Sequence, residues 1–325
     1  MRGTPIPGLV LAACAVLAAG TAPAWADQYL LTPESGDLVG EPRSTVAQHE
    51  DTLIDIARQH KLGYDEIVNA NPGVDPWLPG AGTPIELAKH RVLPTAERRG
   101  IVINLPEHRL YYFPPARAGE TAEVYSYPVS IGKMDWRTPL GVTKIVQKVK
   151  DPPWYPPQSV RDEHAAKGDI LPAVVPAGPD NPLGRFAMRL GIPGGAYLIH
   201  GTNRPAGVGM QVTHGCIRMF PEDIAELYGK VPVNTRVNLI DQPTKLGWSR
   251  GTLYIERSPL LEGGADPGPQ EFERLREYVE VISERRPVDV DWAGVEQAFR
   301  AQNGVPSPVS TPKSPATHAT AMNAR

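Results

Sequence analysis

Two histidines and one cysteine have the types and spacing for nucleophilic chemistry. The chain has 325 residues and two cysteines, and Cys216 is the one outside the first two dozen residues. His200 precedes it within the segment IHG at 199–201, and His214 lies beside it within THGCIRM at 213–219. The thiolate is the nucleophilic form of cysteine, and a neighbouring imidazolium lowers the pKa of a thiol toward neutrality. The arrangement predicts a cysteine acyl-transfer enzyme.

Gly215 favours the same chemistry, because glycine lets the backbone turn sharply just before the sulfur. Consecutive amide N–H groups, those of Gly215 and Cys216, can then face an oxyanion that forms beside Sγ. Each donor of this kind typically contributes roughly 3 kcal/mol of transition-state stabilisation.

Two alternatives stay open for these residues. A lone cysteine is by default a small core side chain, although the polar or small flanks Thr213, His214, Gly215 and Arg218 suit an exposed loop better. The second alternative is a metal site in which His200, His214 and Cys216 form a His2Cys set. The absence of CxxC and HExxH, and the single residue between His214 and Cys216, argue against a metal.

The pattern of His-Gly, a dozen residues and Thr-His-Gly-Cys-Ile-Arg-Met resembles the signature of the L,D-transpeptidases, the YkuD-domain cysteine enzymes of bacterial cell walls. The resemblance covers about residues 99–262 and is closest to the periplasmic ErfK/YbiS-like subgroup. Many members have Asn two places after the cysteine, where this chain has Arg218. Arg218 is expected either to bind substrate or to brace the loop.

The resemblance implies a mechanism without a metal or another cofactor. Cys216 attacks the carbonyl before the terminal D-alanine of a peptidoglycan tetrapeptide stem, D-alanine leaves, and an amine resolves the thioester. His200 matches the first histidine of the family motif and is the expected base, oriented by the Gly201 carbonyl. His214 is expected to support the loop and tune the sulfur.

Three acceptors fit this chemistry: a diaminopimelate side chain, the lysine of an outer-membrane lipoprotein, and water. The subgroup resemblance favours the lipoprotein. A Cys-His carboxypeptidase or amidase that acts on the same wall remains an alternative. So does a non-catalytic peptidoglycan-binding protein.

Composition is that of an ordinary globular protein with room for two modest domains and tails. The formal net charge of −3 argues against a nucleic-acid partner. The 36 prolines and 31 glycines predict a mainly β or α+β protein with long ordered loops.

Residues 1–26 have the pattern of a secretory signal, with an apolar run at 9–20 and an A-x-A cleavage site at 24–26. The apolar run is too short to span a bilayer. The pattern predicts a periplasmic protein without a transmembrane segment in its mature form. A lipobox-like sequence at Cys14 leaves lipid anchoring as an alternative. Cleavage after residue 26 leaves Cys216 as a lone, reactive thiol.

Residues 44–88 predict a strand–helix–helix–strand module, with Asp51 as the first N-cap. The segments DTLxxIA and NxNP resemble a LysM module, a family that binds glycans containing N-acetylglucosamine, although Glu50 replaces the usual glycine. The alternative is a small packing domain without a ligand. Residues 89–98 are expected to be a linker.

Residues 99–241 form the expected catalytic domain. Short strands follow one another with one short helix at 224–228, which predicts a β-sandwich or barrel-like domain rather than a Rossmann fold. The segment TPLG, which begins at Thr138, resembles a family element at the mouth of the cleft. Thr138, Thr213 and Arg218 are therefore expected to contact substrate.

The segment 151–182 is dense in proline and is expected to contain no regular helix or strand. Loops of this length are often lids or binding loops. We expect Trp154 and Tyr155 to form a wall of the cleft. Beyond the catalytic domain, residues 242–300 predict an extension with a strand at 253–256 and an amphipathic helix at 270–282. Residues 306–325 have the composition of a disordered tail.

Overall fold

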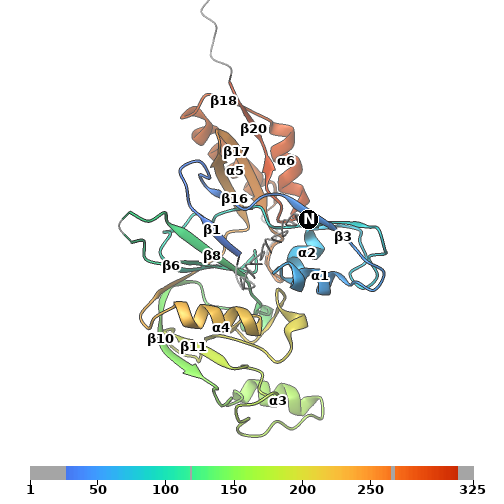
Figure 1. The fold of residues 1–325 in the computed structure, drawn as a ribbon, viewed down its shortest axis with the longest axis vertical. Helices are drawn as coiled ribbons and strands as arrows, with labels where there is room; N and C mark the ends of the chain where they lie inside the picture. The colour runs from blue at the N-terminus through green and yellow to red at the C-terminus, as the bar shows by residue number, and fades with distance from the viewer. Residues whose placement is uncertain (1–26, 118, 265–267, 314–325) are drawn as a thin grey trace, which may run out of the picture.

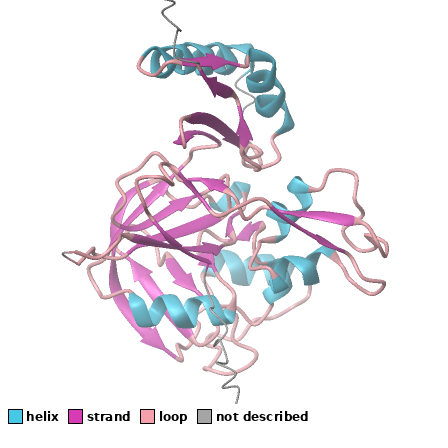
Figure 2. Cartoon of the chain, turned by 45° about the horizontal axis from the view of Figure 1, so that its top comes forward, coloured by secondary structure: helices cyan, strands magenta, loops and turns pink. Residues whose placement is uncertain are grey.

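The computed structural model describes residues 27–117, 119–264 and 268–313 (Figure 1). The largest element is a mixed nine-stranded sheet with the order β1-β8-β7-β6-β15-β10-β11-β12-β14. The expected mainly β, α+β fold class is confirmed, and the large sheet dominates the catalytic body in Figure 2. Its strands are β1 (Asp27–Leu30), β6 (Gly100–Asn104), β7 (Arg109–Phe113), β8 (Glu123–Pro128), β10 (Gly141–Lys150), β11 (Phe186–Leu190), β12 (Leu198–His200), β14 (Ile217–Arg218) and β15 (Arg236–Ile240).

The central strands of this sheet are buried on both faces, with Ile101 and Ile103 of β6 in one apolar cluster and Val102 in a second. The strands β6 and β7 form a hairpin, with Asn104 paired to Arg109 across the turn. The helix α4 (Pro221–Lys230) begins at a proline and buries Ile224 and Leu227 in the first of these clusters. A short pair of parallel strands, β9 (Ile131–Gly132) and β13 (Gln211–Thr213), holds the two loops that flank the cysteine.

The N-terminal module has β3 (Arg43–Val46) paired with β4 (Pro84–Leu87), and between them α1 (Leu53–Gln59) and α2 (Tyr64–Ala70). The strand–helix–helix–strand order is as expected, but the N-cap of α1 is Thr52 rather than Asp51. Thr52 and Asp55 form a reciprocal capping box, which satisfies two free N–H groups at the helix start.

The C-terminal module lies at one end of the molecule (Figures 1 and 2). The expected amphipathic helix is α5 (Gly268–Glu284), which buries Leu275 and Val279. The expected strand is β17 (Thr252–Arg257). The remaining elements were not predicted: α6 (Trp292–Ala301), β16 (Thr244–Ser249), β18 (Val288–Val290), β19 (Ser307–Pro308) and β20 (Ser310–Pro312).

Two expectations about connecting segments are wrong. The expected disordered tail from residue 306 is ordered as far as residue 313, because β19 pairs with β17 and β20 pairs with β18. The 89–98 linker begins as buried structure, with β5 (Arg91–Val92) paired to β2 (Leu38–Val39). The predicted signal, Cys14 and the last residues of the tail lie outside the described residues. Within the described ranges, no helix is long and apolar enough to cross a membrane.

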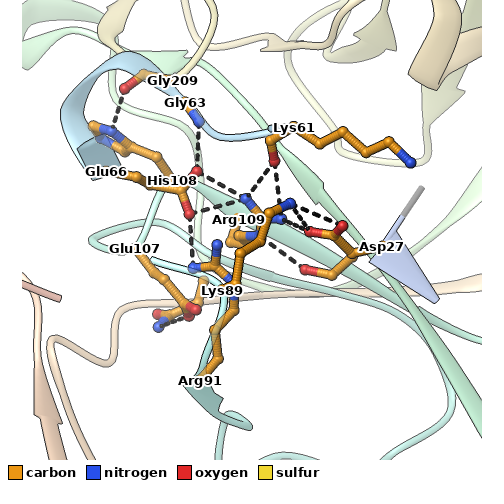
Figure 3. A network of polar contacts seen from close by, with 12 residues as sticks. Asp27, Lys61, Gly63, Glu66, Lys89, Arg91, Glu107, His108, Arg109 and Gly209 are labelled. Atoms are coloured by element: carbon orange, nitrogen blue, oxygen red, sulfur yellow. Dashed lines mark hydrogen bonds and ion pairs between the residues drawn. The ribbon is translucent and has the colours of Figure 1, made fainter. Parts of the chain in front are cut away.

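A buried network of charges joins these parts (Figure 3). Glu66 of α2 accepts hydrogen bonds from Arg91 and Arg109, each with a closest contact of 2.8 Å. Asp27 of β1 pairs with Lys89 at 2.7 Å and with Arg109 at 3.3 Å. Arg109 thus ties the catalytic sheet to both the N-terminal strand and the N-terminal module.

Candidate active site

The parallel strands β12 and β14 bring the two sequence motifs together. Ile199 lies opposite Ile217, and His200 lies opposite Arg218. Both isoleucines are fully buried in the core of the sheet. Since side chains alternate between the two faces of a strand, His200 and Arg218 project to the other face. Cys216 directly precedes β14, and Arg218 lies close enough to both His200 and Cys216 to shift the pKa of each. The sheet therefore brings together the expected nucleophile, the expected base and the arginine.

The backbone turns just before Cys216, as expected from Gly215, which has a φ of +93°. Thr138 Oγ1 donates to the Gly215 carbonyl oxygen at 3.2 Å, and the Gly132 N–H donates to Thr138 Oγ1 at 3.1 Å. On the other side, Thr213 Oγ1 donates to the Cys216 carbonyl oxygen at 2.6 Å. The turn is thus held at both carbonyls.

Thr138 and Thr213 are buried, with 4% and 2% of their surface exposed. Their hydroxyls form hydrogen bonds to the main chain of the turn. This geometry disagrees with the substrate contact expected for both residues. It favours support of the nucleophile loop, because a hydroxyl that braces a buried carbonyl is not directed at a ligand.

His200 is 5% exposed, and its Nδ1 lies 2.6 Å from the Gly201 carbonyl oxygen. A carbonyl only accepts, so Nδ1 carries the proton in the neutral ring and Nε2 carries the lone pair. Burial lowers the pKa of His200 to about 3, and the charge of Arg218 adds to this effect. These causes outweigh the carbonyls of Gly201 and Leu183, which favour the protonated ring. The ring is therefore neutral near neutral pH.

Cys216 is partly exposed, and its Sγ donates to the Ala196 carbonyl oxygen at 3.7 Å. Burial raises the pKa of the Cys216 thiol, and a hydrogen bond from the Leu198 backbone and the charge of Arg218 oppose this only in part. The expectation of an imidazolium that lowers the thiol pKa is therefore wrong for the resting site. Burial favours the neutral forms of both groups, a thiol beside a neutral imidazole.

The ring of His214 is directed at the insert. Its Nε2 lies 2.7 Å from Glu163 Oε2, and its ring packs edge-on to Trp136 with the centroids 4.6 Å apart. This contact supports the expected loop-bracing role. It disagrees with a His2Cys metal site, for which His200, His214 and Cys216 must converge. Among the residues that the structure describes, no three His, Cys, Asp or Glu side chains are grouped to hold a metal ion.

The insert at 151–182 contains a helix, α3 (Gln158–Ala166), which the sequence analysis excluded. The prolines flank this segment and are absent from it, so the helix forms between them. At the base of the insert, the buried amide of Asn181 donates to the Pro152 carbonyl at 2.8 Å. Trp154 is half-buried and Tyr155 is exposed, in agreement with an accessible wall.

Arg218 is largely buried, which lowers its pKa, and its Nε has no hydrogen-bond partner among the described residues. Arg204 lies close enough to lower that pKa further. A cavity of about 360 Å³ extends from Arg204 to α1, where Arg58 lines it among apolar side chains. Sequence pattern did not indicate Glu163 or Arg204 as site residues, because a single charged residue carries no signal of the distant residues that it contacts.

The model of the YkuD L,D-transpeptidase catalytic domain matches residues 98–239. The probable L,D-transpeptidase YcfS of Escherichia coli is 41% identical over 252 residues, which are 76% of this chain and 78% of that protein. The probable L,D-transpeptidase YbiS of Escherichia coli is 38% identical over 283 residues, 86% of this chain and 90% of that protein. The NMR structure of the catalytic domain from Enterococcus faecium L,D-transpeptidase covers 45% of this chain and 100% of its own, at 22% identity and a TM-score of 0.32.

Proposed function

The chain belongs to the YkuD family of L,D-transpeptidases, and on that premise we propose that Cys216 is the nucleophile that attacks peptidoglycan tetrapeptide stems. Sγ adds to the carbonyl carbon before the terminal D-alanine, and its proton passes to His200 Nε2. The C–N bond then breaks, the proton returns to the leaving amine, and D-alanine departs. The product is a thioester, which an acceptor amine resolves.

One observation carries the proposal: β12 ends at His200, its parallel partner β14 begins directly after Cys216, and the Nδ1–Gly201 contact sets the tautomer in which Nε2 carries the lone pair. For proton transfer, Sγ must rotate from the Ala196 carbonyl toward His200. The neutral ring is the form that can accept the proton of Sγ, and the protonated ring can then give it to the leaving amine.

The peptide plane between Gly215 and Cys216 supports an oxyanion site. In a trans peptide, the C=O and N–H point in opposite directions. Thr138 holds the Gly215 carbonyl, so the Cys216 N–H is fixed and directed away from Thr138. We assign the N–H groups of Gly215 and Cys216 to the oxyanion, with Thr138 and Thr213 as their supports.

Arg218 and Arg204 support binding of an anionic peptide. Tetrapeptide stems carry free carboxylates, and guanidinium groups recognise carboxylates through paired hydrogen bonds. The unpartnered Nε of Arg218 is available for such a contact. Trp154 and Tyr155, on the insert, are proposed to line the same cleft.

For the acceptor we propose an amine, the lysine of an outer-membrane lipoprotein, on the resemblance of the Arg218-containing motif to the anchoring subgroup. A diaminopimelate acceptor or water would make the enzyme a crosslinking enzyme or an L,D-carboxypeptidase instead. The signal-like pattern of residues 1–26 supports a periplasmic location. We further propose that the N-terminal module binds the glycan strand, on its LysM-like strand–helix–helix–strand order.

The test is the intact mass of the protein after incubation with a disaccharide-tetrapeptide, with chelator present. We expect an acyl adduct that lacks one D-alanine, because the thioester forms before the acceptor enters. The adduct should be absent from Cys216→Ala and at least about 100-fold slower to form in His200→Ala, since general base catalysis contributes on that order.

Addition of a lysine-terminated peptide, diaminopimelate or buffer alone then identifies the acceptor from the product mass. An adduct of equal yield in Cys216→Ala would overturn the assignment of the nucleophile. The absence of any adduct in the wild-type protein, with zinc retained through purification, would favour metal chemistry.

A further inference from the structure

The insert reaches the nucleophile loop through Glu163. This residue lies on α3, and its carboxylate contacts His214 Nε2 at 2.7 Å, Lys133 Nζ at 3.2 Å and Lys167 Nζ at 2.9 Å. Among the described insert residues, it is the one whose side chain forms hydrogen bonds or ion pairs with the loops around Cys216. Figure 1 shows α3 at the end of the molecule opposite the C-terminal module, so this contact is not part of the main core.

Glu163, His214 and Lys133 form a partly buried polar cluster. His214 and Glu163 are 27% and 23% exposed, and Lys133 is 30% exposed. Lys133 Nζ also lies 4.7 Å from the centroid of the Trp136 ring, which packs against His214. The hydrogen bonds from Lys167, His214 and Lys133 hold the pKa of Glu163 well below its usual value. The carboxylate is therefore charged, and it bridges the two loops that flank the cysteine.

The bridged loops are those that shape the turn at Cys216. The Lys133 N–H donates to the Thr213 carbonyl at 2.9 Å, and Thr138, from the same loop as Lys133, holds the Gly215 carbonyl. His214 is joined directly to Gly215 in the chain. A side chain that holds the His214 ring and Lys133 at once restricts rotation of the 214–216 peptides.

We propose that Glu163 is a positioning residue, which acts through His214 and Lys133 to orient the N–H groups of Gly215 and Cys216 toward the oxyanion. This inference rests on the proposed thioester chemistry. It assigns the proline-rich insert a part in transition-state stabilisation, in addition to any wall that it forms around the substrate.

Two reactions of Cys216 Sγ test the positioning role of Glu163. Acylation by the tetrapeptide needs the oxyanion donors, whereas alkylation by iodoacetamide needs only an accessible thiolate and forms no oxyanion. We compare both rates in wild type, Glu163→Gln and Glu163→Ala. The matched control is Asp162→Asn, which changes the neighbouring carboxylate on the same helix, and Asp162 contacts Gln158 rather than the loops.

We expect the Glu163 variants to acylate roughly 10-fold to 100-fold more slowly, through kcat rather than KM, while alkylation stays within about 2-fold of wild type. Asp162→Asn should match wild type in both reactions. His214→Ala combined with Glu163→Ala should be slowed by less than the product of the two single effects, because part of the action of Glu163 passes through His214 and the rest through Lys133.

Equal acylation by wild type and the Glu163 variants would overturn the positioning role. A parallel fall of both rates would also overturn it, because Glu163 would then act on thiol ionisation or access. If wild type is alkylated but never acylated, the proposed thioester chemistry fails instead, so the two failures are distinct.

Discussion

Cys216, His200 and Arg218 lie at or directly beside the paired strands β12 and β14, and burial shifts the pKa of each. Desolvation disfavours the charged form of each group, so the thiol pKa rises and the imidazole pKa falls. The positive charge of Arg218 lowers the pKa of both groups, so it favours the thiolate of Cys216 and the neutral ring of His200. The site therefore does not store a thiolate, and proton transfer accompanies attack on the substrate.

The pH dependence of alkylation follows from these directions. Thiolate appears only as the pH rises through the folded-state pKa, so the iodoacetamide rate of wild type should still increase above pH 9, the ordinary value for a thiol. In Arg218→Met the midpoint should lie higher still, because the charge that favours the thiolate is removed. The rate of alkylation by iodoacetamide, measured at intervals from pH 6 to 11 in both proteins, tests these expectations. A plateau already reached at pH 7 would contradict a neutral resting pair.

The proline-rich insert and the N-terminal module show how single elements serve the site. In the insert, prolines at both ends leave a helix of nine residues between them, and this helix brings Glu163 to the nucleophile loop. In the module, the loop between α2 and β4 exposes Trp77 and Leu78, at 62% and 77%. A large exposed aromatic side chain can stack on a sugar ring. The contact removes apolar surface of the aromatic ring from water at little cost in side-chain entropy.

The proposed glycan binding is tested at this loop. Trp77→Ala should weaken binding to purified sacculi by about 10-fold or more, because the main apolar contact is lost. Tyr278→Ala, which removes an exposed aromatic residue of α5, should bind as wild type does. A pull-down with a concentration series measures both. Undiminished binding by Trp77→Ala would leave the module as a packing domain.

At the scale of the molecule, buried charges join the three modules. The network of Figure 3 ties α2 to the catalytic sheet through Glu66 and Arg109. A second network ties in the C-terminal module, where Lys245 pairs with Glu107 at 2.9 Å and with Glu256 at 2.6 Å. The N-terminal module also donates backbone hydrogen bonds from Tyr64 and Asp65 to the loop between the two sequence motifs. The modules therefore stabilise one another.

Removal of one partner from the first network should be costly. Glu66→Gln leaves Arg91 buried without its paired carboxylate and leaves Arg109 with Asp27 alone, and we expect the free energy of unfolding to fall by about 3–5 kcal/mol. Urea denaturation followed by tryptophan fluorescence measures this. Glu97→Gln, which removes an exposed carboxylate, is the control and should change the value by less than about 0.5 kcal/mol. A loss below about 1 kcal/mol for Glu66→Gln would show that the modules do not depend on the network.

The family and several strands could be predicted from the sequence, because they depend on local pattern. The segment THGCIRM indicated the family and the expected nucleophile, and short apolar runs indicated β6, β7, β11 and β15, whereas the long strand β10 was not predicted. Rules based on residue type alone also placed some features wrongly, where a contact with a nearby residue decided the structure. Asp51 and Thr52 were equally good caps by type, and only Thr52 has Asp55 three residues later in reach of its backbone.

Only the tertiary structure decided what the polar residues do. Thr138 and Thr213 look like substrate contacts in the chain, yet burial against the turn commits their hydroxyls to carbonyls. The protonation of His200 and Cys216 depends on desolvation, which is a property of the packed sheet rather than of residue spacing. Glu163 is separated from His214 by 51 residues, and no sequence period relates them. The sequence determined which atoms could react, and the packing of distant segments determined their charge, orientation and support.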